Sequence, residues 1–246
     1  MARICTGVLT FSPCARGSSP FAGSELYSIV NFGDESLNKR SGTIDIVDAG
    51  AVKRAGTCLV VGVGQFAFFL VFSEVYYPDY NVSLNYISDL GATCVSGACR
   101  FFEPSSSIFD VSILLMGLSL FPGAYYVRKA TGSSSLPTFL ALAGVGAAGV
   151  GIFNESYGGL HTLFSAWTFI AAGIQALLVY KVARPPYSYF SAVTGVVTLA
   201  ATVLYGAHDY LGLGAGGMER VVVYPVLVGG IAFGGYMMGL GDASPY

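Results

Sequence analysis

The sequence predicts an all-α integral membrane protein, a polytopic bundle of six transmembrane helices with both termini in the cytoplasm. Two observations predict this class. The 246 residues are 54% hydrophobic and only 11% charged, which is too little charge to cover a soluble domain. After residue 50, six apolar stretches follow one another, each near the roughly 20 residues that a helix needs to cross about 30 Å of hydrocarbon.

Residues 1–50 differ in composition from the rest of the chain. They mix Gly, Ser, Pro and charges of both signs without periodicity, which predicts a poorly ordered cytoplasmic tail or a start codon assigned too far upstream. They contain no secretory signal peptide, so the first membrane helix is expected to direct insertion. Residues 51–246 are the predicted six-helix domain, with helices at about 55–76, 107–127, 136–154, 160–180, 187–207 and 219–240.

The connections between these helices predict how they pack. A long loop, residues 77–106, links the first two helices, and the other connections are short, so sequential helices are expected to be antiparallel neighbours. In the third helix, Ala143, Ala147 and Gly151 are spaced four apart, a stripe of small residues suited to close helix contact.

The charges predict the orientation in the membrane, because Lys and Arg near helix ends are retained in the cytoplasm. With six alternating helices, one side carries Lys53, Arg54, Arg128, Lys129, Lys181 and Arg184. The opposite side has only Arg100 and Arg220 together with most of the acidic residues, so it is expected to face outward. The loop 77–106 is then external, and a disulfide between Cys94 and Cys99 can persist there, although two unpaired thiols remain the alternative.

The polar residues that could carry chemistry gather on the predicted outer side. Histidine with carboxylates can bind a metal or act as general acid and base. We therefore expect a divalent metal ion, if there is any cofactor, at His161, His208 and Asp89. The candidate catalytic residues are His161, His208, Asp89 and Asp209, and the candidate ligand-binding residues are Arg220, Glu219, Ser88, Asp110 and Glu155.

A structural interpretation accounts for the same residues. The outer carboxylates can be solvated, Arg220 can pair with Asp89 or Asp110, and the histidines can cap helix ends. The net charge of −2 argues against nucleic acid as a partner, and membrane lipids, a membrane protein or a second copy of the chain are the expected partners.

Four segments resemble a known family. They are Ser88-Asp89-Leu90-Gly91, the stretch 107–112 that opens the second helix, the stretch 151–155 continued to His161, and the stretch 218–225 that opens the sixth helix. In this order they resemble the six-helix membrane family called domain of unknown function 998, which occurs in archaea and bacteria. Residues 87–91 are also remotely similar to the Frag1/DRAM/Sfk1 group. Both resemblances imply six helices, and neither implies a reaction.

The leading functional hypothesis is a multi-pass protein of the plasma membrane with an outward-facing polar pocket at the level of the lipid headgroups, which binds or processes a lipid-like ligand. If it is an enzyme, it is a metal- or acid–base-assisted hydrolase or transferase acting at the outer surface. One alternative is a non-catalytic scaffold or accessory subunit of a membrane complex. Another is a small-solute permease with a path through Gln65 and Gln175, the only strongly polar residues at the midplane.

Overall fold

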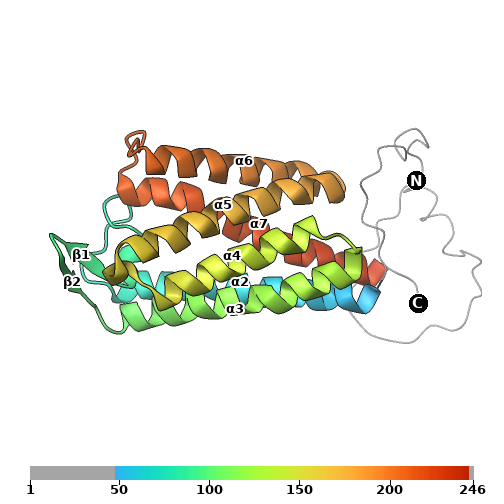
Figure 1. Cartoon of the computed structure of the whole chain (residues 1–246), viewed down its shortest axis with the longest axis horizontal. Helices are drawn as coiled ribbons and strands as arrows, with labels where there is room; N and C mark the ends of the chain where they lie inside the picture. The colour runs from blue at the N-terminus through green and yellow to red at the C-terminus, as the bar shows by residue number, and fades with distance from the viewer. Residues whose placement is uncertain (1–47, 244–246) are drawn as a thin grey trace, which may run out of the picture. The chain divides into compact units, whose positions relative to one another are not determined.

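The six predicted membrane helices are all present in the computed structural model, which describes residues 48–243 (Figure 1). Each is long and apolar enough to cross a membrane. The predicted tail, residues 1–50, lies almost wholly outside the described residues. The helices are α2 (Ala49–Tyr76), α3 (Ser105–Thr131), α4 (Ser135–Ile152), α5 (Gly159–Val182), α6 (Tyr187–Gly206) and α7 (Ala215–Ala243).

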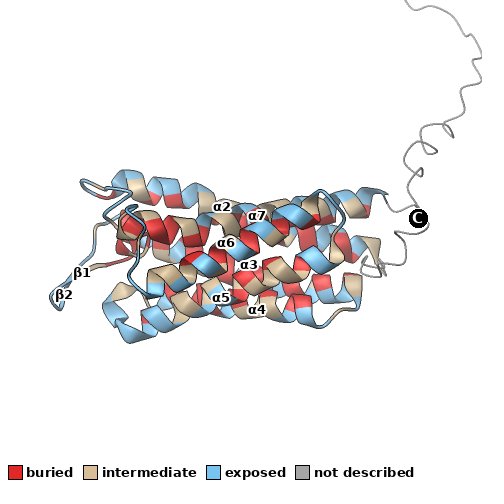
Figure 2. Cartoon of the chain, turned by 90° about the horizontal axis from the view of Figure 1, so that it is seen from above, coloured by how far each residue is buried: buried red, intermediate tan, exposed pale blue. Residues whose placement is uncertain are grey.

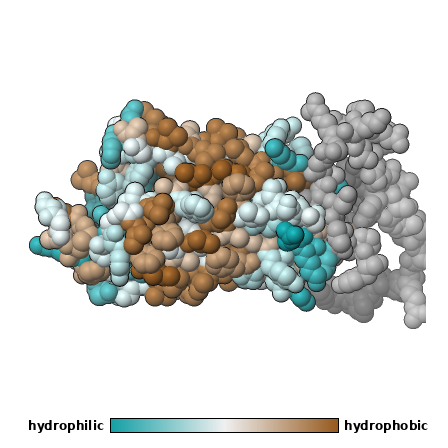
Figure 3. Space-filling view, viewed as in Figure 1, coloured by the Kyte–Doolittle hydropathy of each residue, from teal (hydrophilic) through white to brown (hydrophobic). Residues whose placement is uncertain are grey.

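The six helices form a closed ring in sequence order. Each helix packs against the next one along the chain, as the short connections predict, and α7 returns to pack against α2. Helix α5 also makes a smaller contact with α7. Buried residues lie toward the inside of this ring and exposed ones toward its periphery (Figure 2). On the face seen in Figure 3, apolar residues gather around the middle and hydrophilic residues toward the two ends, as expected of a protein surrounded by lipid.

Two helices, α2 and α7, begin at least four residues earlier than the apolar pattern predicts. Helix α2 begins at Ala49, within the predicted tail, because Asp48 caps it: its carboxylate accepts the N–H of Ala51 at 2.9 Å. The side chain of Lys129 pairs with Asp48 at 3.1 Å, which ties the start of α2 to the end of α3. Helix α7 begins at Ala215, so Glu219 lies inside the helix rather than at its start.

Glycines allow the helices to approach closely around the ring. A Cβ at Gly117 would lie 2.4 Å from the backbone nitrogen of Ala148, and one at Gly144 would lie 2.9 Å from the Gly117 carbonyl oxygen. Contacts of the same kind join Gly56 of α2 to Gly234 of α7, where the ring closes. Such backbone contacts are the usual means by which helices associate in lipid.

The long connection between α2 and α3 is folded rather than irregular throughout. It contains a short 3-10 helix, η2 (Ser88–Leu90), and a hairpin of strands β1 (Thr93–Val95) and β2 (Ala98–Arg100). The preceding segment lies against the start of α7, where the N–H of Gly216 donates to the Ser83 carbonyl at 3.0 Å. A second 3-10 helix, η3 (Glu155–Tyr157), lies between α4 and α5.

Candidate functional site

The candidate site lies at the end of the bundle where α2, α4 and α6 finish and α3, α5 and α7 begin, called here the loop end. All the candidate residues belong to this end, because helix alternation places them there. These residues differ in how far their side chains are buried. Four of the nine candidate residues are buried, namely Asp89, His161, Glu219 and Arg220. Three are half-buried, namely Ser88, Asp110 and Glu155. Two are exposed, namely His208 and Asp209.

Arg220 fastens the α2–α3 loop to the helices. Its Nη2 donates to Glu74 at 2.8 Å and to the hydroxyl of Tyr80, and its Nη1 donates to the carbonyls of Val82, Asn85 and Gly216 at 2.8–3.2 Å. Among residues 48–243, its enclosed Nε alone finds no acceptor. The predicted pairing of Arg220 with Asp89 or Asp110 is therefore wrong: the partner is Glu74, which α2 brings alongside α7.

Glu219, the neighbour of Arg220, holds a different part of the loop. Its Oε2 accepts the backbone N–H of Ile87, directly before η2. Its Oε1 has no hydrogen-bond partner among the described residues, and its side chain is 5% exposed. A carboxyl this deeply buried usually has donors for both oxygens. The chain therefore leaves one acceptor of Glu219 to another group.

Asp89 and Glu155 form a pair of adjacent carboxyls, with the hydroxyl of Ser88 also against Glu155. Burial, and then the negative charge of Asp89, raises the pKa of Glu155 to about 7. Burial also raises the pKa of Asp89, although the Asn85 amide and the Tyr86 N–H, at 3.2 and 2.9 Å, favour its ionised form. Because adjacent carboxylates repel, the pair retains one proton, chiefly on Glu155, as the pH falls below about 7.

Asp110 lies at the start of α3, facing the chain that follows α4. Its Oδ2 accepts the side-chain N–H of Asn154 at 2.9 Å, and its Oδ1 is buried with no hydrogen-bond partner in the described part of the chain. Gly91 packs directly on this oxygen, since a Cβ there would lie 2.5 Å from it. Asp110 therefore joins α3 to the loop after η2 and to the α4–α5 connection.

His161 is a buried, oriented imidazole near the start of α5. Its Nδ1 lies 2.9 Å from the carbonyl oxygen of Phe153, which can only accept, so Nδ1 carries the proton of this contact. The Nε2 of the neutral ring is then an acceptor, and it lies 3.3 Å from the hydroxyl oxygen of Ser165.

His208 and Asp209 lie apart from this group. His208 is exposed and contacts the hydroxyl of Tyr210 at 3.0 Å, and Asp209 accepts the N–H of Leu211. Within residues 48–243, no group of three or more His, Cys, Asp or Glu side chains has the geometry to hold a metal ion. The structure therefore does not bring His161, His208 and Asp89 together as the predicted metal site.

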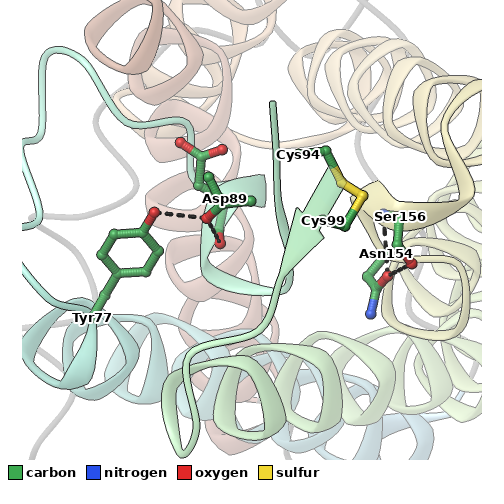
Figure 4. The surroundings of a disulfide bond; sticks show 7 residues. Tyr77, Asp89, Cys94, Cys99, Asn154 and Ser156 are labelled. Carbon is green, nitrogen blue, oxygen red and sulfur yellow. Dashed lines mark hydrogen bonds between the residues drawn. A yellow bond between two sulfur atoms is a disulfide. The ribbon is translucent and has the colours of Figure 1, made fainter. Parts of the chain in front are cut away.

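The hairpin of the loop carries the cysteine pair (Figure 4). Cys94 and Cys99 lie opposite each other on the two strands and are joined by a disulfide. The hairpin is tied to the helices because Thr93 contacts the hydroxyl of Tyr77 at 2.6 Å and donates to the Asp89 carbonyl at 3.1 Å. The disulfide thus braces a segment directly attached to the buried carboxyl pair.

A narrow cavity of about 100 Å³ lies inside the ring, with side chains from all six helices in its wall. Most of the wall is apolar. The part of the wall that α5 contributes extends from His161 to Val179, a length of roughly 27 Å at about 1.5 Å per residue. Polar side chains reach it from the loop end, along one stripe of α5 and from the start of α6; they are Ser88, His161, Ser165, Thr168, Gln175, Tyr187, Ser191 and Glu219.

Sequence reasoning missed Glu74 and Tyr80 as partners of Arg220, and the polar stripe of α5. The stripe has a signal in the sequence: positions 161, 165, 168, 172 and 175 follow the helical spacing of one face. The partners of Arg220 have none, because Glu74 and Arg220 are 146 residues apart.

The fold and composition define a polytopic α-helical membrane protein. The chain belongs to the family described as protein of unknown function (DUF998), whose model matches residues 60–235. This confirms the resemblance drawn from the four short motifs. Comparison with curated proteins and with solved structures gives no match.

Proposed function

We propose that the protein binds a small or single-chain amphiphile inside the helix ring. The apolar part of the ligand occupies the central cavity, and its polar end lies at the loop end against Ser88, His161 and Glu219. The single observation that carries this proposal is the cavity, whose wall is mostly apolar and has an ionisable carboxyl and an imidazole, Glu219 and His161, together at the loop end. An apolar space with a few convergent polar groups is the usual form of a small-molecule site.

The size of the cavity limits the ligand. An engineered cavity of roughly 150 Å³ in a protein core takes up benzene, so about 100 Å³ accommodates a small apolar group or part of one chain, not a two-chain lipid. The proposal concerns binding rather than catalysis, because the two candidate acid–base histidines share no contact: His161 is buried and His208 is exposed.

The loop end is proposed to face outward, in the plasma membrane. The six basic residues near helix ends lie at the opposite end, which the rule for cytoplasmic Lys and Arg places inside the cell. The Cys94–Cys99 disulfide supports this orientation, since such bonds persist outside the reducing cytosol. The ligand would then enter from the outer leaflet or from the outer aqueous side.

The test is site-specific labelling of the full chain in detergent micelles with an octanol that carries a diazirine. Irradiation followed by peptide mass spectrometry is expected to label cavity-facing positions of α5, such as Thr168 and Ala172. Ala143→Leu narrows the cavity from α4 and is expected to reduce this labelling several-fold, with Ala172→Leu as a second variant should the first not fold. Val145→Leu, on the exposed face of the same helix, is the matched control and should leave it unchanged. Labelling confined to lipid-facing positions would overturn the proposal.

One observation favours a second candidate, a small-solute permease. Ser165, Thr168 and Gln175 extend the polar stripe of α5 from His161 past the middle of that helix. Gln65 does not extend this path, because its amide donates to the Gly62 and Ser112 carbonyls between α2 and α3. Uptake of a labelled polyol or amino acid into proteoliposomes, lost on Gln175→Leu, would favour the permease over the binding protein. The scaffold hypothesis stays a prediction.

A further inference from the structure

We infer that the ligand of the central cavity carries a protonated amine at its polar end, held by Glu219. This inference rests on the proposed function and names the class of ligand. It starts from Glu219 because that side chain is 5% exposed, lines the cavity, and has one oxygen without a hydrogen-bond donor. This oxygen is not among the fully enclosed polar atoms of the described residues, so it is accessible to whatever enters the cavity.

The polar end of the cavity has more acceptors than donors. Glu219 Oε1 lacks a donor, and His161 Nε2 faces only the Ser165 hydroxyl at 3.3 Å. Glu155 is not part of the cavity wall, but its carboxyl interacts with the hydroxyl of Ser88, which is, and adds an acidic group near this end. An ammonium group supplies three N–H donors to such a set, whereas a carboxylate or phosphate supplies none.

The charge at this end also favours a cation. Three carboxyls, those of Asp89, Glu155 and Glu219, are close enough to influence one another's ionisation. Arg220 is the nearest basic group, but its terminal nitrogens are already bonded to Glu74, Tyr80 and loop carbonyls. Arg100, on the hairpin, is exposed. An anionic headgroup would therefore meet acidic groups and no free basic partner, whereas a cation would be attracted as these carboxyls ionise.

The groups that face Glu219 come from every element around it, and they set the expected dependence on pH. They are Arg220 and Tyr224 on its own helix, Asp89 and Glu155 from the two 3-10 helices, Tyr80 and Tyr86 from the loop and Tyr205 from α6, and His161 of α5 lies in the wall of the same cavity. The pKa of Glu155 is raised to about 7, so the site becomes more negative as the pH rises through about 7. Amine affinity should therefore increase from about pH 6 to about pH 8, below the pKa of an alkylamine near 10.

The experiment measures how octylamine, octanol and octanoate compete with the diazirine octanol for labelling of the full chain at pH 8. Octylamine is expected to compete at a concentration at least about tenfold lower than octanol, and octanoate more weakly than both. Glu219→Gln keeps a carbonyl acceptor for the Ile87 N–H but removes the charge. It is expected to weaken octylamine roughly 10- to 100-fold, the range of a hydrogen bond to a charged group, and to leave octanol nearly unchanged.

The outcomes separate the two proposals. Equal competition by octylamine and octanol, both reduced by Ala143→Leu, would overturn the amine and leave amphiphile binding intact. Stronger competition by octanoate would also overturn it, as would an octylamine effect that Glu219→Gln does not change. Absence of cavity labelling by the octanol probe would defeat the proposed function itself. The comparison of the three wild-type competitors decides the question even if the Glu219 variant fails to fold.

Discussion

Glu219 and Arg220 are adjacent in the sequence, yet the structure gives them different roles. Arg220 is turned toward α2 and the loop, and its bonds with Glu74, Tyr80 and three carbonyls hold these together. Glu219 is turned toward the inside of the ring, where it bonds Ile87 and borders the cavity. The sequence showed that both residues were unusual, since charges in a membrane helix are costly. It could not distinguish the residue that fixes the loop from the one that can meet a ligand.

Replacing Arg220 tests its structural role. Arg220→Met leaves Glu74 without its partner in a largely buried position, and we expect the free energy of unfolding to fall by about 3–5 kcal/mol. The measurement is unfolding of the purified protein in mixed micelles with increasing sodium dodecyl sulfate. Arg100→Met, at an exposed position of the hairpin, should change it by less than about 0.5 kcal/mol. An equal effect of the two substitutions would contradict the role given to Arg220.

Helix contacts depend on which glycines face a neighbouring backbone. The predicted stripe of Ala143, Ala147 and Gly151 lies in α4, and all three residues face the inside of the bundle or α3. Gly151 meets the backbone of α3, since a Cβ there would lie 2.7 Å from the Asp110 carbonyl oxygen, but Gly117 and Gly144, which make contacts of the same kind, lie outside that stripe. The chain has 33 glycines, so composition predicts close packing but does not identify the contacting pairs.

Two glycine substitutions distinguish the effect of a helix–helix contact on stability from the effect of helix propensity. Gly117→Ala places a Cβ 2.4 Å from the Ala148 nitrogen, so α3 and α4 must move apart, and we expect a loss of about 1–3 kcal/mol in unfolding free energy. Gly64→Ala, where nothing lies within 4 Å, should instead raise it by about 0.5–1 kcal/mol, because alanine is the better helix former. The same unfolding assay measures both, and a gain at position 117 would show that this contact is absent.

The expected orientation of the bundle in the membrane rests on the charged residues near its two ends. At the end opposite the loop, Lys53 pairs with Asp242 at 2.6 Å and Lys129 with Asp48 at 3.1 Å. These pairs join α2, α3 and α7 where the ring closes. The basic residues there predict a cytoplasmic location of both this end and the two termini.

Cysteine accessibility in intact cells tests this orientation. In a chain whose Cys5, Cys14 and Cys58 are replaced by serine, Leu84→Cys in the exposed loop should react with a membrane-impermeant maleimide added outside. Ser134→Cys, between α3 and α4, should react only after the cells are opened. The reverse pattern would place the loop end inside.

The six spans, the expected orientation and the gathering of polar residues at one end can be read from residues close together in the chain. Each depends on the length of an apolar run, on charges beside it, or on helix alternation. The closure of the ring by α7 against α2, the Arg220–Glu74 pair, the separation of His208 from His161 and the cavity depend on residues far apart in the chain. Packing decides them, because a helix of known length can still rotate about its axis, and that rotation determines which side chains meet.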